Sequence, residues 1–250
     1  MKTANRLNGI GEYYFSQKLR QIEELNRQGK QIINLGIGSP DLPPHPDVIR
    51  ELQEEAARPG VHGYQSYKGS PLLRKAISDW YAKWYAVTLN PDTEILPLIR
   101  SKEGIMHICM TYFENGVAVL VPNPGYPTYS SAVQLSGAIP LYYDLKAENN
   151  YEPDFNQLES LIKKGSESPL QGVRGLWVNY PHMPTGKKAS DKIFKRIIDF
   201  GKKHNILICH DNPYSFILND KPQSILQVDG ALDVAIELNS LSKSHSMAGW

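Results

Sequence analysis

The chain has 250 residues, which is long enough for a large hydrophobic core in one domain or two. It is 41% hydrophobic and 21% charged, and a formal net charge of +1 gives no electrostatic reason to expect a nucleic acid or an acidic membrane as partner. No apolar run approaches a membrane span, and the first residues lack the apolar stretch of a signal peptide. We therefore expect a globular protein that binds neither nucleic acid nor membrane.

The N-terminal 44 residues predict an arm with one helix. Apolar residues recur at helical spacing, in Phe15, Leu19, Ile22 and Leu25. Gly29 ends this helix, and residues 31–37 predict a short strand that leads into a proline-rich loop. Two more helices are predicted, over residues 47–57 and 71–85. The second of them begins at a proline after Ser70, which we expect to cap it.

From residue 93 onward, strand-like and helix-like runs alternate. Short apolar runs typical of strands cover residues 94–99, 117–122, 139–144, 175–180, 205–211 and 234–240. Amphipathic runs typical of helices cover residues 102–113, 127–137, 155–164 and 190–204. This alternation predicts an α/β domain in three layers, with a mostly parallel sheet between two layers of helices.

Several polar residues follow directly after predicted strands. They are Ser101, Asn123 to Tyr126, Asn179 to Gly186, Asp211 and Lys243. Ligands of parallel sheets bind at the carboxyl ends of the strands, where the loops gather, so these residues are the candidates for a site.

Each of these residues alone has an ordinary explanation as a turn residue, a helix cap or a solvated side chain. Together, however, they fit one ligand, pyridoxal 5'-phosphate. This cofactor needs a lysine amine, a carboxylate at its pyridine nitrogen, a nest for its phosphate, a flat ring on its face and a donor to its phenolic oxygen. Lys243, Asp211, the helix start at Ser101–Lys102, Tyr126 and Tyr214 supply these groups.

Seven stretches of the chain together resemble the fold-type I pyridoxal-phosphate-dependent aminotransferases of class I/II. They are NLGIGSPDLPPHP, YQSYKGSPLLRKAI, RSKEGI, VPNPGYPTY, NYPHMPTG, CHDNPYS and NSLSKSHSMAGW. Singly they are moderately specific, but their common order in the chain is highly specific. The resemblance implies a segment of a small domain in residues 1–44 and the cofactor-binding large domain, cut short, in residues 45–250.

The resemblance also implies roles for residues of the cofactor centre. Lys243 matches the lysine that forms a Schiff base with the cofactor and then moves the substrate's proton. Asp211 matches the carboxylate that keeps the pyridine nitrogen cationic. Tyr214 matches the tyrosine that donates to the phenolic oxygen, and Tyr126 takes the position of the stacking aromatic ring.

Five further residues match positions at the edge of the site. Ser101 and Lys102 match the phosphate loop at a helix N-terminus. Ser240 matches a phosphate-binding serine, and Tyr64 matches a tyrosine that reaches the phosphate of a partner subunit. Gly38 matches a glycine whose backbone lies against the substrate.

Three departures from the family pattern stand out. Met183 replaces the asparagine that usually donates to the phenolic oxygen, and a thioether cannot donate. Tyr214 then makes that contact alone, or Asn179 compensates. Arg100 stands where a glycine commonly precedes the phosphate loop. The family's phosphate and carboxylate arginines and its C-terminal small domain would follow Trp250, so we expect a longer protein cut short.

The resemblance implies transfer of an amino group from an amino acid to a 2-oxo acid, of the aspartate, alanine or diaminopimelate type, by a homodimer. A lyase with the same cofactor and a non-catalytic cofactor-binding domain are the alternatives. No metal is expected, because the seven histidines lack metal-ligand spacing. Cys109 and Cys209 lie in apolar runs, which favours free buried thiols and a cytoplasmic location; a disulfide is an alternative that nothing in the sequence favours.

Overall fold

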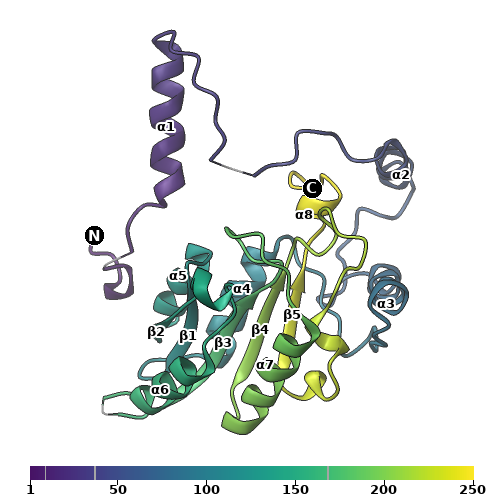
Figure 1. Cartoon of the computed structure of the whole chain (residues 1–250). Coiled ribbons are helices and arrows are strands. Elements are labelled where there is room, and N and C mark those ends of the chain that lie inside the picture. The colour runs from purple at the N-terminus through teal and green to yellow at the C-terminus, as the bar shows by residue number, and fades with distance from the viewer. Residues whose placement is uncertain (9, 37, 168) are drawn as a thin grey trace.

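A parallel sheet forms the centre of the protein (Figure 1). The computed structural model describes residues 1–8, 10–36, 38–167 and 169–250. In this part of the chain the sheet has five strands in the order β2-β1-β3-β4-β5, and each neighbouring pair is parallel. The strands are β1 (Ala118–Asn123), β2 (Ile139–Asp144), β3 (Val173–Asn179), β4 (Leu207–Asn212) and β5 (Ala235–Asn239). The predicted α/β class with a mostly parallel sheet is confirmed.

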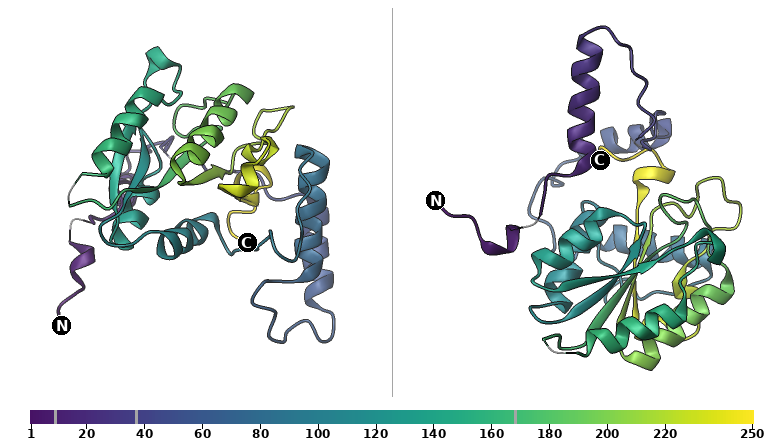
Figure 2. Two further views of the ribbon diagram at one scale, coloured as in Figure 1. Left: turned by 90° about the horizontal axis from the view of Figure 1, so that it is seen from below. Right: turned by 60° about the vertical axis from the view of Figure 1, so that its left-hand side comes forward.

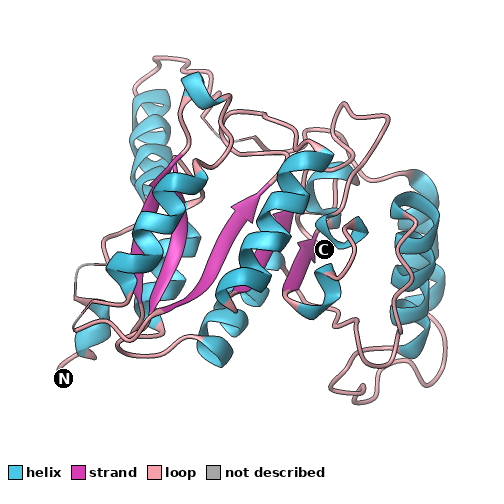
Figure 3. Cartoon of the chain, turned by 60° about the horizontal axis from the view of Figure 1, so that its bottom comes forward, coloured by secondary structure: helices cyan, strands magenta, loops and turns pink. Residues whose placement is uncertain are grey.

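Helices cover both faces of this sheet, as the left view of Figure 2 shows, and Figure 3 looks onto the helices in front of one face. The longer helices are α1 (Tyr14–Arg27), α2 (Pro46–Ala56), α3 (Pro71–Tyr85), α4 (Ser101–Tyr112), α5 (Pro127–Leu135), α6 (Phe155–Gly165) and α7 (Asp191–His204). Short helical turns are η1 (Asn5–Leu7), η2 (Ala147–Asn149), η3 (Ile225–Gln227), η4 (Ala231–Asp233) and α8 (Leu241–Ser244). In the described part of the chain no helix is both long and apolar enough to cross a bilayer.

Strand residues alternate between two hydrophobic cores. Leu120 and Leu176 point to the core under α6 and α7, whereas their neighbours Val119 and Trp177 point to the core under α4 and α5. Both faces of a strand must be apolar in such a sheet, which explains why the strands read as continuous apolar runs in the sequence. The three-layer arrangement follows from this burial on both faces.

Helix α7 shows how the local sequence produces one of these layers. Ser190 caps the helix, with its Oγ accepting a hydrogen bond from the Ile193 amide at 3.2 Å. Ile193 and Ile197 are buried one turn apart. On the other side of the helix, Lys195 pairs with Asp199 at 2.8 Å in solvent. This amphipathic pattern places one face of α7 on the sheet.

The structure corrects two of the predicted strands. Residues 94–99 are irregular, because Pro97 has no amide hydrogen and the Ile99 amide donates to Glu103 Oε2 at 2.9 Å. Residues 31–36 are also irregular, and Ile37 lies outside the described residues. Here the Ile32 amide donates to the side chain of Asn26, so it is not available to a neighbouring strand.

The predicted boundaries of α3 agree with the structure, but its expected cap does not. The helix runs over Pro71–Tyr85 after Ser70, yet the Ser70 side chain makes no capping hydrogen bond. The backbone position, set by the proline at the first helical residue, is what begins the helix there. Cys109 and Cys209 are free and buried, as the sequence indicated.

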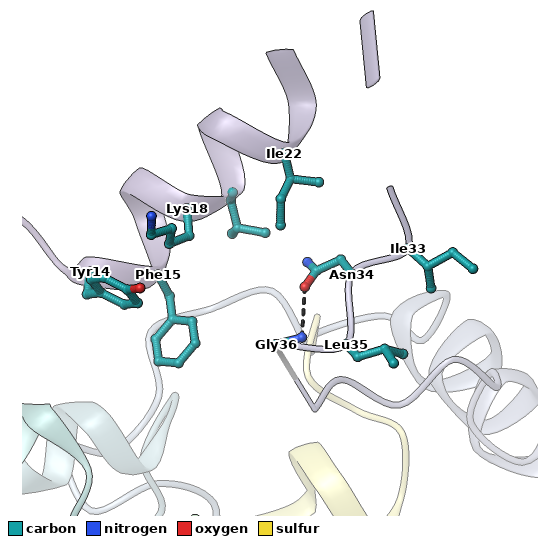
Figure 4. A pocket seen from close by; sticks show the side chains of 9 residues that line it. Tyr14, Phe15, Lys18, Ile22, Ile33, Asn34, Leu35 and Gly36 are labelled. Atoms are coloured by element: carbon teal, nitrogen blue, oxygen red, sulfur yellow. Dashed lines mark hydrogen bonds between the residues drawn. The ribbon is translucent and has the colours of Figure 1, made fainter. Parts of the chain in front are cut away.

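Helix α1 of the N-terminal arm stands clear of the three layers. Helix α1 extends away from the sheet in Figure 1, and none of its described residues is buried. An apolar hollow lies between α1 and the segment before the proline-rich loop, with Phe15, Ile22 and Leu35 among its lining residues (Figure 4). No predicted site residue lines this hollow among the described residues, so the candidate site must be sought at the sheet.

Candidate active site

The candidate residues gather beyond the carboxyl ends of β1, β3, β4 and β5. The sheet order changes direction between β1 and β3, because β2 lies on one side of β1 and β3 on the other. Such a switch point opens a crevice in which α/β proteins bind ligands. Tyr126 follows β1, Asp211 lies near the end of β4, and Lys243 lies in α8, which Figure 1 shows beyond the end of β5.

Asp211 is a buried carboxylate with one oxygen that accepts no hydrogen bond from the described residues. Its side chain is 4% exposed, and Oδ2 accepts a hydrogen bond from the Tyr129 hydroxyl at 2.6 Å. Oδ1 is buried and has no hydrogen-bond partner within the described residues. Burial raises the pKa of Asp211 to about 6, although the Tyr129 hydrogen bond opposes this. A buried acceptor of this kind calls for a donor, preferably a cation.

Asn179 fixes the backbone around this carboxylate. Its side-chain amide donates to the Asp211 carbonyl at 2.8 Å, and its Oδ1 accepts from the Met183 amide at 2.8 Å. Asn179 is itself buried, and it lies opposite Asp211 in the register of β3 and β4. The Asn179 side chain is thus bonded to backbone groups through both its oxygen and its nitrogen.

Lys243 is held by a short helix and by a distant segment of the chain. Ser240 caps α8, its Oγ accepting from the Ser242 amide at 3.1 Å. The Lys243 Nζ donates to the Gly38 carbonyl at 2.9 Å. The strand expected over residues 234–240 ends at Asn239, and residues 241–244 form a short helix. The capping of α8 orients the lysine, and Gly38 brings the N-terminal segment to its amine.

Tyr214 lies in the turn after β4, with its hydroxyl 3.6 Å from the Met183 sulfur. A thioether is a weak acceptor, so the hydroxyl proton is available to a better partner. Burial raises the pKa of Tyr214, and the nearby Asp211 carboxylate raises it further. The hydroxyl therefore stays protonated and can act as a donor at neutral pH.

Aromatic rings form one wall of the site. The ring of Tyr126 packs edge-on against Tyr129 at 5.6 Å, and Tyr129 stacks on Trp177 at 5.0 Å. A Cβ atom on Gly125 would lie 2.5 Å from the Pro122 carbonyl oxygen, so only glycine fits before Tyr126. These contacts hold the Tyr126 ring in one place.

The start of α4 supplies positive potential on the same side. Ser101 is its first residue; the amides of Glu103 and Gly104 donate to the Arg100 carbonyl, which leaves those of Ser101 and Lys102 at the positive end of the helix. The Lys102 amine lies 5.8 Å from the centre of the Tyr126 ring. Arg100 precedes the helix and is exposed. Tyr64 is not brought to these residues; its side chain is fully exposed in the loop between α2 and α3.

Two residues of this region were missed by sequence analysis. Tyr129 bonds Asp211, and its position one helical turn after Tyr126 was the available signal. Tyr13 comes from the N-terminal arm, and its ring lies 5.8 Å from the Lys102 amine. Burial and the neighbouring Tyr126 raise the pKa of Tyr13. No local pattern marks Tyr13 as a site residue, because Lys102 and Tyr126, its neighbours at the site, are about ninety or more residues away in the chain.

Comparisons with known proteins agree with the predicted family. The sequence profile described as "Aminotransferase class I and II" matches residues 30–250. LL-diaminopimelate aminotransferase from Dehalococcoides mccartyi is 44% identical over 252 residues, which cover all of this chain and 63% of that protein. The enzyme of the same name from Aquifex aeolicus is 39% identical over 250 residues, covering 99% of this chain and 62% of the relative.

A solved structure gives the same result for the fold. Substrate-bound BacF from Bacillus subtilis is 34% identical, with a TM-score of 0.91 over all of this chain and 62% of that one. The chain therefore spans somewhat less than two thirds of the length of these relatives. Since the profile match covers most of its residues, the chain belongs to the class I and II aminotransferase family.

Proposed function

We propose that this chain carries the pyridoxal-phosphate site of an aminotransferase, which moves an amino group from an α-amino acid to a 2-oxo acid. One observation carries the proposal: Asp211 Oδ1 is buried and without a partner in the described part of the chain, at the strand ends near which the described Lys243 lies. A protonated pyridine nitrogen is the kind of donor that such an oxygen lacks. The residues present therefore fit the cofactor.

When bound, pyridoxal phosphate supplies a ring that accepts electrons and so stabilises negative charge at the substrate Cα. Asp211 would keep the proton on the pyridine nitrogen. Lys243 would hold the cofactor through Nζ and then carry the proton to and from the substrate Cα. The Gly38 carbonyl, which accepts from Nζ, orients the amine toward the side of the site that the N-terminal segment covers.

The remaining candidates position the cofactor and exclude water. Tyr214 would donate its hydroxyl proton to the phenolic oxygen, and Tyr126 would cover the ring face. Amides at the start of α4, beginning with Ser101, would meet the phosphate together with Lys102 and Ser240. The Tyr214 hydroxyl is available for its role, because the Met183 sulfur that it now contacts is a weak acceptor.

The test of this proposal is covalent labelling of one lysine. The chain is mixed with pyridoxal phosphate, reduced with borohydride, digested and analysed by mass spectrometry. We expect the added cofactor mass on Lys243 of the unaltered chain. In Lys243→Ala we expect no labelled peptide, at this position or at another lysine. Lys164, an exposed lysine at the end of α6, gives the matched control variant Lys164→Ala, which should label like the unaltered chain.

A second measurement decides the reaction type: the products are analysed after an amino donor is added to protein that has taken up pyridoxal phosphate. Addition of an amino donor should release a 2-oxo acid and leave pyridoxamine phosphate, as transfer requires. Release of ammonia with an unsaturated or decarboxylated product would show the lyase alternative instead. A chain that takes up no cofactor contradicts the proposal altogether.

We propose a dicarboxylic or dibasic α-amino acid as the amino donor, with LL-diaminopimelate tested first. The support is the name of the relatives that are 39–44% identical to this chain. Aspartate and alanine are the competing donors from the sequence resemblance, and a comparison of kcat/KM for the three donors separates them.

The Met183 position offers a prediction about the cofactor's colour change with pH. In Met183→Asn, an amide donor joins Tyr214 near the phenolic oxygen and stabilises its anion. The stabilised anion attracts less strongly the proton on the nitrogen that joins Lys243 to the cofactor. We therefore expect the pKa of that nitrogen to fall by about one unit. Absorbance titration measures it. Met183→Leu removes the sulfur without adding a donor and should leave this pKa unchanged; equal shifts in both variants would contradict the role.

We propose a homodimer in which Tyr64 serves the partner's site. In support, the side chains of Tyr64, Tyr67, Leu72 and Ile99 are 80% exposed or more, an unusual amount for large apolar or aromatic residues. Tyr64→Phe should weaken cofactor binding roughly tenfold, through loss of a hydrogen bond to a charged group. Mixing Tyr64→Ala and Lys243→Ala chains should restore one complete site in each hybrid dimer. Light scattering gives the oligomeric state, and a monomer would refute the arrangement.

The domain division and the compartment stay as proposals. We propose that residues 1–44 belong with a smaller domain and residues 45–250 with the large one, supported by the separation of α1 from the three layers (Figure 1). We propose a cytoplasmic location because the free thiols Cys109 and Cys209 are compatible with a reducing compartment.

A further inference from the structure

The rings of Trp80, Trp84, Phe216 and His245 form an aromatic cluster beside α3, and the Tyr85 ring also contacts Phe216, at 5.9 Å. Trp80 and Trp84 come from the helix, Phe216 from the turn after β4, and His245 from the end of α8. Neither Phe216 nor His245 has a role in the proposed chemistry. Their positions in the chain are informative, since Phe216 lies two residues after Tyr214 and His245 two residues after Lys243.

Trp80 is the ring that contacts both of these residues. Its centroid is 5.0 Å from that of Phe216 and 5.4 Å from that of His245. Phe216 and His245 are 6.4 Å apart, so the three rings pack as one unit. Trp84 lies one turn further along α3 and contacts Phe216 at 5.6 Å. Among the ring contacts of the described residues, Trp84 has none with His245.

The segments that Trp80 joins have little regular structure to fix them. Helix α8 is four residues long, shorter than an isolated helix that would be stable in water. Tyr214 and Phe216 lie in a turn. Ring burial of this kind contributes stabilisation in proportion to the apolar area covered, with a further gain for edge-on ring pairs. The contact of His245 with Trp80 therefore restrains the position of the C-terminal end of α8 relative to α3.

Hydrogen bonds attach α3 to the sheet, so the helix that carries Trp80 is fixed relative to β5. The Tyr81 hydroxyl donates to Glu237 Oε1 at 2.8 Å, and Asn239 Nδ2 donates to the Tyr85 hydroxyl at 3.3 Å. Both partners are in β5, the strand that leads into α8. Trp80 is thus part of a helix whose distance from β5 is fixed.

We propose that Trp80 is a positioning residue that sets the separation between Lys243 and Tyr214, by supporting His245 and Phe216 on one indole ring. The inference rests on the proposed function for the roles of Lys243 and Tyr214. Removal of the indole frees α8 and the turn to move relative to each other. The cofactor then loses simultaneous contact with the amine and the phenol hydroxyl, a loss that small displacements are enough to cause.

The chain offers a matched control in Trp84. Trp80→Leu and Trp84→Leu remove the same ring from the same helix, but only the first removes the contact with His245. We expect Trp80→Leu to weaken pyridoxal phosphate binding at least tenfold and to shift the pH titration of the Lys243–cofactor bond. Trp84→Leu should stay within twofold of the unaltered chain in both measurements. Trp80→Phe, which keeps a ring, should fall between them.

A second measurement needs no cofactor. Hydrogen exchange of the peptide covering residues 240–248 reports on α8, where the His245 amide donates to the Leu241 carbonyl at 3.1 Å. We expect exchange in this peptide to be at least fivefold faster in Trp80→Leu and unchanged in Trp84→Leu. Trp80 also packs against the core around Tyr81 and Tyr85, whereas Trp84 is 41% exposed, so the two variants are compared at equal free energies of unfolding, measured in urea. If Trp80→Leu does not fold, Trp80→Phe and Trp84→Phe decide between the same outcomes.

The cofactor-binding and hydrogen-exchange measurements together distinguish failure of the positioning role of Trp80 from failure of the proposed function. Equal effects of the Trp80 and Trp84 variants, or unchanged exchange in Trp80→Leu, would overturn the positioning role. If the unaltered chain takes up no pyridoxal phosphate, the proposed function fails, and the exchange arm alone still decides whether Trp80 fixes the Lys243 segment.

Discussion

Asp211→Asn is expected to make the cofactor-free chain more stable at neutral pH while weakening its cofactor binding severely. Burial raises the pKa of Asp211 from its ordinary 3.8 to about 6. Between these two pH values the unfolded chain binds fewer protons than the folded one, so stability falls as pH rises and stays lower above pH 6. A difference of about two units corresponds to an upper bound of about 3 kcal/mol. Asparagine is neutral and has no such loss.

Urea unfolding at two pH values tests this stability prediction. At pH 4 the carboxyl is largely protonated in the fold, and variant and unaltered chain should have similar free energies of unfolding. At pH 7.5 the variant should be more stable by roughly 1–3 kcal/mol, because the Tyr129 hydroxyl can donate to the asparagine oxygen as it does to Oδ2. A variant that is less stable at pH 7.5 would show that the Asp211 charge is compensated in the free protein.

Although Asp211→Asn should stabilise the cofactor-free chain, the same change should weaken its binding of pyridoxal phosphate. An amide cannot hold the proton on a pyridine nitrogen, and loss of one member of a buried charge pair costs about 2–5 kcal/mol. We expect pyridoxal phosphate to bind at least 100-fold more weakly to Asp211→Asn in equilibrium titrations. Binding to the unaltered chain should weaken as pH falls below about 6, where Asp211 takes up a proton. Asp144→Asn, at the end of β2, is the control and should bind normally.

Glu237→Ala is expected to bring the fold close to its limit of stability. Glu237 and His210 have side chains with 0% exposure and lie 2.8 Å apart, and Ser224 and Tyr81 also donate to the Glu237 carboxylate. The second ring nitrogen of His210 faces the Tyr180 carbonyl at 3.0 Å. Both ring nitrogens of His210 therefore face oxygen atoms inside the protein, one of them the Glu237 carboxylate.

Removing the carboxylate leaves the buried His210 ring and the hydroxyl groups of Ser224 and Tyr81 without their partner. Breaking such a pair costs about 3–5 kcal/mol, a large part of the total stability of a domain. Urea unfolding of Glu237→Ala measures the loss. The double variant His210→Leu with Glu237→Leu removes both partners and should be more stable than Glu237→Ala. A cost below about 1 kcal/mol for the single change would contradict this role of Glu237.

The sheet and its helices could be predicted because their signals are local. In β1, every residue from Ala118 to Val121 is buried, so the strand reads as an unbroken apolar run. The failures at residues 31–36 and 94–99 have a local cause too. There, side chains of Asn26 and Glu103 take backbone amides that a strand would have used, and hydrophobicity does not register such bonds.

The chemistry of the site depends on contacts that no short stretch contains. Asp211 stood out in the sequence, but its raised pKa comes from burial by the assembled sheet. Its partner Tyr129 is 82 residues away. Glu237 looked like an ordinary strand residue, and only the packing of α3 and β4 around it makes it a buried charge. Sequence analysis thus located the candidate groups, whereas their electrostatics follow from the tertiary structure.

The hydrogen bond between Lys243 and Gly38 also has a consequence for synthesis in the cell. The two residues are 205 positions apart. A ribosome that adds 5–20 residues per second therefore makes Gly38 roughly 10–40 s before Lys243. All five strands of the described sheet precede Lys243 in the chain and have been made by then. We expect the cofactor to be captured by a sheet that has largely formed, so that its binding completes folding and does not nucleate it.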